Sequence, residues 1–470
     1  MKKKMMIVCG VVFILVLAIF SSFHPAERSS SFKQHVVYQK EDIRKTGIKQ
    51  DGSLVTHLPV LIVDTKGKEV PGAQGKTDEK LLCEYQIIDH QDQMNDTKDL
   101  PTQKGYMLLS VRGNSSRLFP KKQYAVKLVN EKGETRRQEM FGMPAHDNWT
   151  LNGSYIDHSN IRNYMLYNLS SEIMPFTPRS RMCEVMMKDE FGKLVYQGIY
   201  TLIEKPKVDK NRVDLQTYNP KYAQTSFLLQ INSPIDHVEI PHLKPDNIDV
   251  LYPAELLYPS EQEITNASIK YITNTLLKVE KAFYDSYYSG DWEKVHELID
   301  LNSFVDYYII NEYCQNYDAG RRSTYLYADL DGKLCIGPVW DFDGGFDNYM
   351  HKHMDVTWLD LKSTFYYSYL VQDPQFNVQC AKRYFELRKN TLSDDYIISY
   401  IDDCKKYLGT AAYRNQALWY AHKLKQQPLH KPNEDKFDDF DTDIEEMKKY
   451  VVKRGKWMDQ HFQSLLELYS

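Results

Sequence analysis

Short runs of apolar residues, some alternating with polar ones, recur through the first half of the chain. They cover residues 58–64, 81–89, 106–112, 123–130, 181–188 and 194–203. Runs of this length, bounded by turn-forming residues, predict β-strands. The run at 161–173 instead has apolar residues three and four positions apart, which predicts a helix with Asp157 or Ser159 as its N-cap. The first half is therefore predicted to be β-rich with one helix.

The second half is dominated by apolar residues at helical spacing. After an irregular stretch from about residue 208, helices are predicted over residues 266–288, 292–299, 301–313, 374–389, 394–406, 411–424 and 444–468. Two β-rich runs, 323–329 and 333–340, interrupt them, and Asp331-Gly332 between these runs predicts a tight hairpin. The whole pattern favours an α+β protein.

The amino-terminal 23 residues form the sharpest change of composition. Lysines at 2–4 precede an apolar run over residues 5–23, and this run of roughly 19 residues is long enough to cross a bilayer as a helix. The lysines predict that the amino end stays inside and that the body lies outside the cytoplasm. We favour an uncleaved signal anchor, with a cleaved signal peptide as the alternative. The polar residues 24–55 are predicted to be a linker.

Length, charge and cysteine content limit the function classes. A chain of 470 residues, 42% of them hydrophobic, is long enough for two lobes that share a cleft. A net charge of −5 implies no broad basic field, so we expect no nucleic-acid partner. The seven cysteines include no C-x-x-C pair, which argues against a zinc site, and their odd number argues against a disulfide scaffold.

Carboxylates stand where the second run of the predicted hairpin ends. Asp341 and Asp343 are followed by two glycines, and the hairpin could bring Asp318 beside them. Hard oxygen ligands suit Mg²⁺ or Mn²⁺ next to a phosphate, and glycines allow a ligand to approach the backbone. The alternative is an acidic turn that only caps a strand.

A second candidate feature is the loop of small residues at 112–116. It begins with a cation, Arg112, continues through Asn114 and Ser115, and is followed by Lys122 and the strand that contains Lys127. Backbone N–H groups and ammonium charges of this kind can cradle an anion. A plain hairpin remains the alternative.

Several pieces of sequence, in order along residues 57–466, resemble the spore coat protein H (CotH) kinase family. They are LPVLIVDT, RGNSS with PKKQYAVKL, W-x-L with D-x-S-x-I-R-N, QGIYTLIEK, D-x-x-x-x-S-T-YLY, PVWDFD and KKYVVKRGKWMDQHF. The resemblance implies a two-lobed, atypical protein-kinase-like fold. Its β-rich N-lobe would cover residues 56–205, and its mainly helical C-lobe, with the catalytic hairpin, residues 206–470.

The same resemblance implies ATP and Mg²⁺ (or Mn²⁺) as cofactors and assigns roles around the transferred phosphate. Asp318 would be the base near the acceptor hydroxyl. Asp341 would hold the metal, with Asp343 assisting. Ser323 would bind a second metal, although the family usually has Asn there and serine is a shorter and weaker ligand.

Further residues would contact the nucleotide. Lys127 resembles the kinase strand lysine that pairs the α- and β-phosphates, and Glu172 would be the ion-pair partner of Lys127. Lys122 is the second candidate for the role of this lysine. The loop with Arg112, Asn114 and Ser115 would cover the phosphates. Glu204 would lie at the inter-lobe connection, near the adenine.

The function implied is transfer of the γ-phosphate to Ser or Thr of an extracytoplasmic, surface or spore-coat protein. The partners would be ATP, a Ser/Thr-rich protein and, through residues 1–23, the cell membrane; a secreted or spore-coat location is the alternative. A membrane-tethered pseudokinase that acts as a binding or assembly module is a competing interpretation, with Ser323 in its favour. The D-x-D motif also resembles that of haloacid dehalogenase phosphatases, in which the first Asp is a nucleophile.

Overall fold

The computed structural model describes residues 39–233, 237–243, 252–348, 354–420 and 440–469. The predicted anchor or signal segment at 1–23 lies outside the described residues. Among the described helices, none combines the length and the apolar character needed to span a bilayer. Strands and helices are both abundant, which confirms the α+β prediction.

The first half forms a closed barrel. Its strands, in spatial order, are β10 (Asn148–Asn152), β12 (Leu194–Glu204), β11 (Ser180–Lys188), β3 (Val60–Asp64), β4 (Leu81–Ile88), β6 (Gln103–Arg112) and β7 (Gln123–Val129). β7 pairs with β10 and closes the ring. On β7, Tyr124, Val126 and Leu128 are buried in the barrel core, whereas the alternate residues Gln123 and Ala125 face a cleft outside it. This alternation explains why the sequence predicted the barrel strands well.

Shorter strands flank the barrel. β1 (Gly47–Ile48), β2 (Leu54–Thr56) and β5 (Asn95–Asp96) form one small sheet, and β8 (Gln138–Met140) pairs with β9 (Met143–His146). Leu54 and Val55 are buried. The end of the predicted linker at 24–55 is therefore packed onto the folded body.

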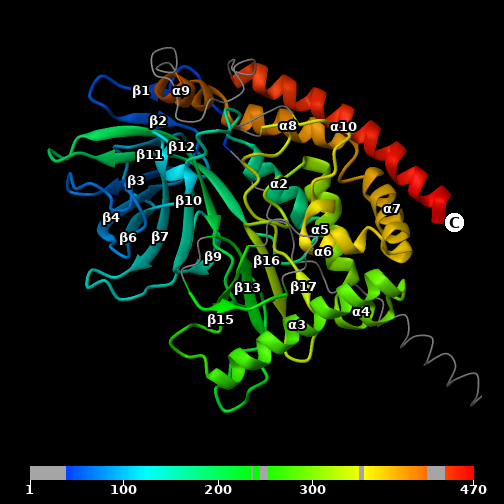
Figure 1. The fold of residues 1–470 in the computed structure, drawn as a ribbon. Coiled ribbons are helices and arrows are strands. Elements are labelled where there is room, and N and C mark those ends of the chain that lie inside the picture. The colour runs from blue at the N-terminus through cyan, green and yellow to red at the C-terminus, as the bar shows by residue number, and fades with distance from the viewer. Residues whose placement is uncertain (1–38, 234–236, 244–251, 349–353, 421–439, 470) are drawn as a thin grey trace, which may run out of the picture.

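A second, open sheet lies in the other half, next to the barrel (Figure 1). Its order is β14 (Glu239–Ile240), β15 (Ala254–Tyr258), β13 (Phe227–Ile231), β16 (Thr324–Ala328) and β17 (Cys335–Ile336). The sequence reading missed β13, β14 and β15. It also predicted too long a second hairpin strand, because Pro338 has no N–H to extend the ladder. Residues 328–334 connect the paired strands, so the hairpin is wider than predicted.

Helices surround the open sheet. They are α2 (Arg162–Ser171), α3 (Asn266–Ser289), α4 (Glu293–Leu298), α5 (Leu301–Cys314), α6 (Phe365–Leu370), α7 (Pro374–Arg388), α8 (Asp394–Leu408), α9 (Thr410–Trp419) and α10 (Phe440–Tyr469), with short 3-10 helices η2 (Ser115–Leu118) and η3 (Leu361–Ser363). α10 runs along the outside of α7 and α8 (Figure 1). α2 and α5 are buried along almost their whole length, so they form the centre of this half.

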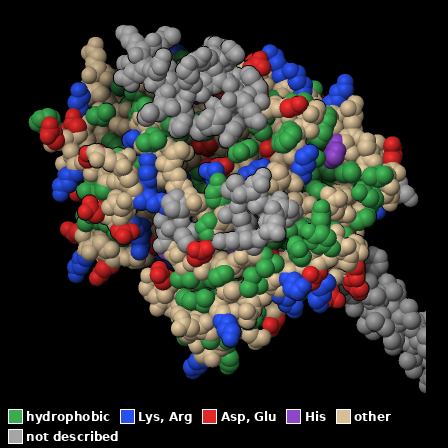
Figure 2. All heavy atoms as spheres, in the orientation of Figure 1, with side chains coloured by type: hydrophobic (Ala, Val, Ile, Leu, Met, Phe, Trp, Pro, Cys, Tyr) green, Lys and Arg blue, Asp and Glu red, His purple; other side chains and the backbone are tan. Residues whose placement is uncertain are grey.

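α9 joins the two halves. The side-chain oxygen of Asn415 accepts hydrogen bonds from the backbone N–H of Ile199 at 3.0 Å and from the ammonium of Lys121 at 2.9 Å. The carboxylate of Glu41, within the predicted linker, accepts a hydrogen bond from the N–H of Thr410 at the start of α9, at 3.2 Å. Basic and acidic side chains are interspersed on the face seen in Figure 2, in keeping with the small net charge.

Candidate active site

A cleft with a volume of about 370 Å³ lies between the barrel and the open sheet. Arg112, Ala125 and Thr150 line it from the barrel side, and Gln230 and Tyr325 from the sheet side. Strands β13 and β16 place these last two residues directly opposite each other. The cleft therefore has two rigid walls of β-structure.

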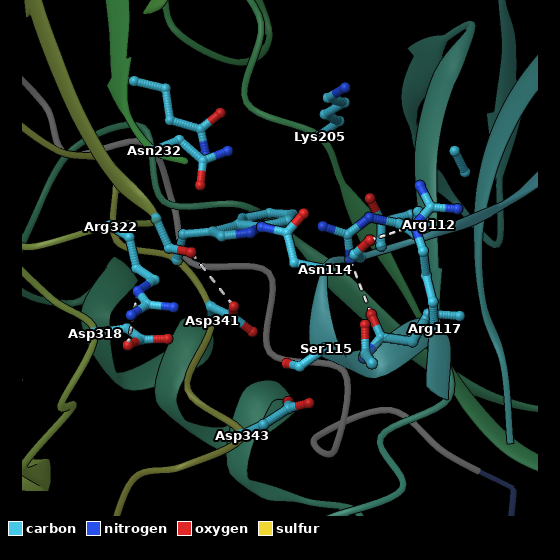
Figure 3. A pocket seen from close by; sticks show the side chains of 18 of the residues that line it. Arg112, Asn114, Ser115, Arg117, Lys205, Asn232, Asp318, Arg322, Asp341 and Asp343 are labelled. Carbon is cyan, nitrogen blue, oxygen red and sulfur yellow. Dashed lines mark hydrogen bonds and ion pairs between the residues drawn. The ribbon is translucent and has the colours of Figure 1, made fainter. Parts of the chain in front are cut away.

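Three predicted carboxylates reach this cleft: Asp318, Asp341 and Asp343 (Figure 3). Asp318 lies in the turn after α5, and the other two lie directly after the hairpin. The antiparallel hairpin folds the chain back, as the sequence predicted, and brings the later pair near Asp318. The pairing of β16 with β17 is antiparallel, so this D-x-D motif does not follow the parallel strand that the haloacid dehalogenase alternative requires.

Helix α2 holds residues 341–345, which we name the metal segment, in place. The N–H of Asp341 donates to the hydroxyl of Tyr167 at 3.1 Å, and the N–H of Phe342 donates to the side-chain oxygen of Asn163 at 2.8 Å. The amide nitrogen of the same Asn163 donates to the carboxylate of Asp343. The side chains of one buried helix thus fix the backbone of Asp341 and the carboxylate of Asp343.

The backbone is strained at two candidate metal ligands. Asp341 has a φ of +64° and Ser323 a φ of +52°, in the left-handed region that residues with a Cβ seldom adopt. The hydroxyl of Ser323 donates to the carboxylate of Asp341 at 3.4 Å. Strain of this kind, about 1–3 kcal/mol for each residue, is concentrated at functional sites. It is consistent with a ligand-binding role for both.

Burial raises the pKa of all three aspartates, and the charge of Asp341 adds to this effect at the other two. Burial, and then the charge of Asp341, raise the pKa of Asp318 to about 6. The same two causes raise the pKa of Asp343 to about 8, and burial raises the pKa of Asp341 itself. A cation between these groups would favour their ionised forms. The site is therefore electrostatically suited to a divalent metal.

The donor set fits magnesium better than a metal with an all-protein cage. Among the described residues, no group of three or more His, Cys, Asp or Glu side chains converges closely enough to hold an ion alone. Mg²⁺ usually takes one or two carboxylates and completes its shell with water and phosphate oxygens. Asp341 and Asp343, with the hydroxyl of Ser323, match that requirement.

Cations flank the carboxylates. Arg112 lies over the ring of Trp340, with 5.9 Å between its guanidinium carbon and the ring centre, and donates to Gln123 at 2.9 Å. Arg322 lies 3.4 Å from the carboxylate of Asp318. Lys205 extends into the cleft from the end of β12 (Figure 3). These positive charges give the cleft the means to bind phosphate groups.

The loop at 112–116 is fixed over the cleft. Gly113 has a φ of +102°, and a Cβ there would stand 1.8 Å from the hydroxyl of Ser116, so only glycine fits. The side chain of Asn114 donates to the carbonyl of Ser233 at 2.9 Å, across from the loop. Arg117 donates to the carbonyl of Val111 at 2.6 Å and fastens the base of the loop.

The structure brings most of the predicted site residues together. The seven that line the cleft are Arg112, Asn114, Ser115, Asp318, Ser323, Asp341 and Asp343. Lys127, Lys122 and Glu204 are not among its lining residues.

Lys127 lies further along its strand than the residues that line the cleft, so its contact with the nucleotide stays a prediction. Its side chain lies on the same face of β7 as those of Gln123 and Ala125, which do line the cleft. Two residues span about 7 Å in a strand, so Lys127 lies beyond Ala125. Lys122 instead donates to the carbonyl of Arg117 at 2.7 Å and supports the loop from below.

Two predicted glutamates serve other contacts. Glu204 is buried and pairs with Arg179 at 3.0 Å. Glu172, expected to pair with Lys127, accepts hydrogen bonds from the hydroxyl of Tyr396 at 2.8 Å and that of Thr391 at 3.2 Å. These contacts hold α2 against α8.

Sequence reasoning missed several residues of the site. Lys205 is the last residue of the QGIYTLIEK match, directly after Glu204, so its place in that match was the available signal. Asn163 and Tyr167 are one helical turn apart on α2, but nothing in the helix pattern shows that they face the metal segment. Trp340 was read as the end of a strand, whereas its ring supports Arg112.

Comparison with known proteins agrees with this geometry. A family model described as CotH kinase protein matches residues 109–458, which is more than half of the chain and includes every cleft residue discussed above. A search of curated proteins found no match to the chain.

Proposed function

The chain belongs to the CotH kinase protein family, and on this premise we propose that it transfers the γ-phosphate of ATP to a Ser or Thr hydroxyl of a protein. The observation that supports this most is that three aspartates, Arg112, Lys205 and the loop at 112–116, which we name the glycine loop, line one cleft. The arrangement offers negative groups for a metal and positive groups for phosphates, as phosphoryl transfer requires.

Each carboxylate has a role in this proposal. Asp341 and Asp343 would hold Mg²⁺ or Mn²⁺, which when bound neutralises phosphate charge. Asp318 would accept the proton of the acceptor hydroxyl, and its ion pair with Arg322 orients it. Asn114 and Ser115 would cover the phosphates, and Arg112 would bind them. The barrel and the helical half would act as the two lobes of an atypical protein kinase.

The acceptor and the location are proposed from the sequence. The lysines and the apolar run at 1–23 favour a single-pass anchor, with the body outside the cytoplasm. The acceptor would then be a surface, secreted or spore-coat protein rich in Ser and Thr. A tethered pseudokinase that acts as a binding module is the second candidate, because Ser323 offers a weaker ligand than the usual Asn.

The test is phosphate transfer by the full-length chain. The protein is incubated with γ-labelled ATP, Mg²⁺ or Mn²⁺ and a Ser/Thr-rich protein, beside Asp341→Asn, Asp318→Asn and the control Asp331→Asn in the hairpin loop. We expect both site variants to lose about 100-fold or more of the rate and the control to keep it.

Three results would contradict the kinase proposal. Transfer that persists in both site variants would show that another centre is responsible. ATP-dependent stabilisation without transfer would favour the pseudokinase, and a phosphoaspartyl adduct on Asp341 would favour a phosphatase.

A further inference from the structure

We propose that Arg162 is a positioning residue for the metal segment and that Asp443, in the first turn of α10, acts through it. The carboxy-terminal helix would then be part of the apparatus that holds the metal ligands. This inference rests on the proposed function. It concerns a residue that does not line the cleft and an element that is far from it in the sequence.

Arg162 occupies an unfavourable position unless it has a specific purpose. It is 2% exposed and lies in the first turn of α2, where the helix dipole disfavours a cation. Its guanidinium donates to the carboxylate of Asp157 at 2.7 Å. It also donates two parallel hydrogen bonds, both at 2.9 Å, to the carboxylate of Asp443. The Nε–H group of the guanidinium remains for the metal segment.

That remaining donor binds the backbone two residues beyond Asp343. The Nε of Arg162 donates to the carbonyl of Gly345 at 2.9 Å. The next residue of α2, Asn163, binds Phe342 and Asp343. The first turn of α2 therefore contacts the metal segment at Phe342, Asp343 and Gly345.

The charges explain why Asp443 is needed for this grip. Burial alone would lower the pKa of Arg162, but the carboxylates of Asp443 and Asp157 raise it, so the guanidinium stays charged. In return, Arg162 holds the pKa of Asp443 below its usual range against the effect of burial. Without Asp443, the buried guanidinium of Arg162 would keep only the carboxylate of Asp157, and its side chain would rotate to find another partner for its charge. The carbonyl of Gly345 would then lose its donor, and the metal segment would shift.

Only arginine has the geometry for this contact. A guanidinium presents donors in a planar fork that can serve two carboxylates and a carbonyl at once, whereas a lysine ammonium is a point charge. We name the contacts of Arg162 with Asp443 and with the carbonyl of Gly345 the clamp. Arg162→Lys is expected to lose this clamp, although it keeps the positive charge.

A purely structural ion pair is the competing explanation, and α10 provides its control. Asp459, nearer the end of the same helix, receives two hydrogen bonds from Arg388 of α7, at 2.9 and 3.0 Å. The pair has the same chemistry and fastens the same helix, but it lies away from the metal segment. Asp459→Asn should therefore loosen α10 without disturbing the metal ligands.

The experiment compares Asp443→Asn, Arg162→Lys and Asp459→Asn in the full-length chain. Three quantities are measured: the Mg²⁺ concentration for half-maximal transfer, the KM for ATP, and the shift of Tm on adding Mn²⁺ alone. For the first two variants we expect the half-saturating Mg²⁺ concentration to rise about tenfold, since supporting residues of metal ligands commonly contribute 10- to 100-fold. The KM for ATP should stay within about twofold, and the Mn²⁺-induced shift should shrink.

The control decides between the two explanations. An unchanged metal requirement in Asp459→Asn, at a comparable loss of Tm, supports the clamp. If Asp443→Asn keeps the wild-type metal requirement, or if Asp459→Asn changes it equally, the clamp is wrong while the kinase proposal stands. If the wild type shows neither transfer nor a Mn²⁺-induced shift, the proposed function fails, and this inference fails with it.

Discussion

At the scale of the residue, the protonation of Asp318 sets the working range of the proposed base. A carboxyl group accepts a proton only when it is ionised, and burial with the nearby Asp341 raises the pKa of Asp318 to about 6. We therefore expect kcat/KM for phosphate transfer to rise with pH through about 6 and then to level. Arg322 opposes this shift, so Arg322→Gln should move the rise to higher pH.

A pH–rate profile of the wild type and Arg322→Gln checks this prediction. The comparison is Arg321→Gln, because Arg321 donates to the carbonyl of Asp360 and its charge lowers the pKa of Asp318 less than that of Arg322 does, so this variant should move the rise by a smaller amount. A profile that is flat between pH 5 and 7 would remove Asp318 from the role of base, since about 6 lies between these limits.

Ser323 stands where the resemblance to the family implies Asn, so the substitution Ser323→Asn tests the importance of this difference. Its φ of +52° is one that asparagine adopts more readily than serine. Ser323→Asn also adds a longer amide oxygen beside Asp341. We expect tighter metal binding by several-fold, a rate at least equal to the wild type, and no loss of Tm. Mn²⁺ titration of the two proteins measures this, and weaker binding by the variant would exclude position 323 from the metal site.

At the scale of the element, the glycine loop needs its sharp turn at Gly113. An added Cβ would meet the hydroxyl of Ser116, so Gly113→Ala should distort the loop and raise the KM for ATP about tenfold or more. Gly133 is a matched control, because its φ of +81° imposes the same backbone strain but a Cβ there meets nothing within 4 Å. Equal effects of the two substitutions would show that strain alone, and not the loop, is responsible.

The elements also show how far the sequence could predict this structure. Barrel strands and long helices have strong periodicity, because one face of each is buried in a core. β13 lies between β15 and β16 in the sheet, and neither of these strands is adjacent to it in the chain, so local pattern gave no signal for its pairing. The same limit applies to the site. The hairpin brought Asp318 and Asp341 together as predicted, but on β7 Ala125 lines the cleft while Lys127, on the same face of the strand, lies beyond it.

At the scale of the whole molecule, Asp343 links metal binding to the free energy of unfolding. Its pKa is about 8 in the folded protein and near 3.8 when unfolded. The stabilising effect of its bound proton is complete below pH 3.8, and it is lost as pH rises through about 8. Without metal, we therefore expect Asp343→Asn to have a higher Tm than the wild type at pH 8, by about 2–4 °C.

Added metal should remove that advantage. At pH 8 the wild type ionises Asp343 when Mn²⁺ binds, so its Tm should rise more than at pH 6, whereas the variant should respond little at either pH. Calorimetry with a chelator and with Mn²⁺ measures both proteins. A metal-induced rise in Tm that is independent of pH would show that Asp343 is not a ligand.

The closed barrel has a consequence for the order in which the protein is built. All of its strands lie between Val60 and Glu204, and the first of them, β3, pairs with β11 through Val60 and Glu184. The ribosome therefore completes the barrel and α2 long before residue 341 emerges. During that interval the guanidinium of Arg162 has Asp157 but not Asp443. A nascent chain would thus carry a complete barrel beside a helix α2 whose Arg162 still lacks one of its two carboxylate partners. Only the synthesis of α10 would supply that partner, Asp443.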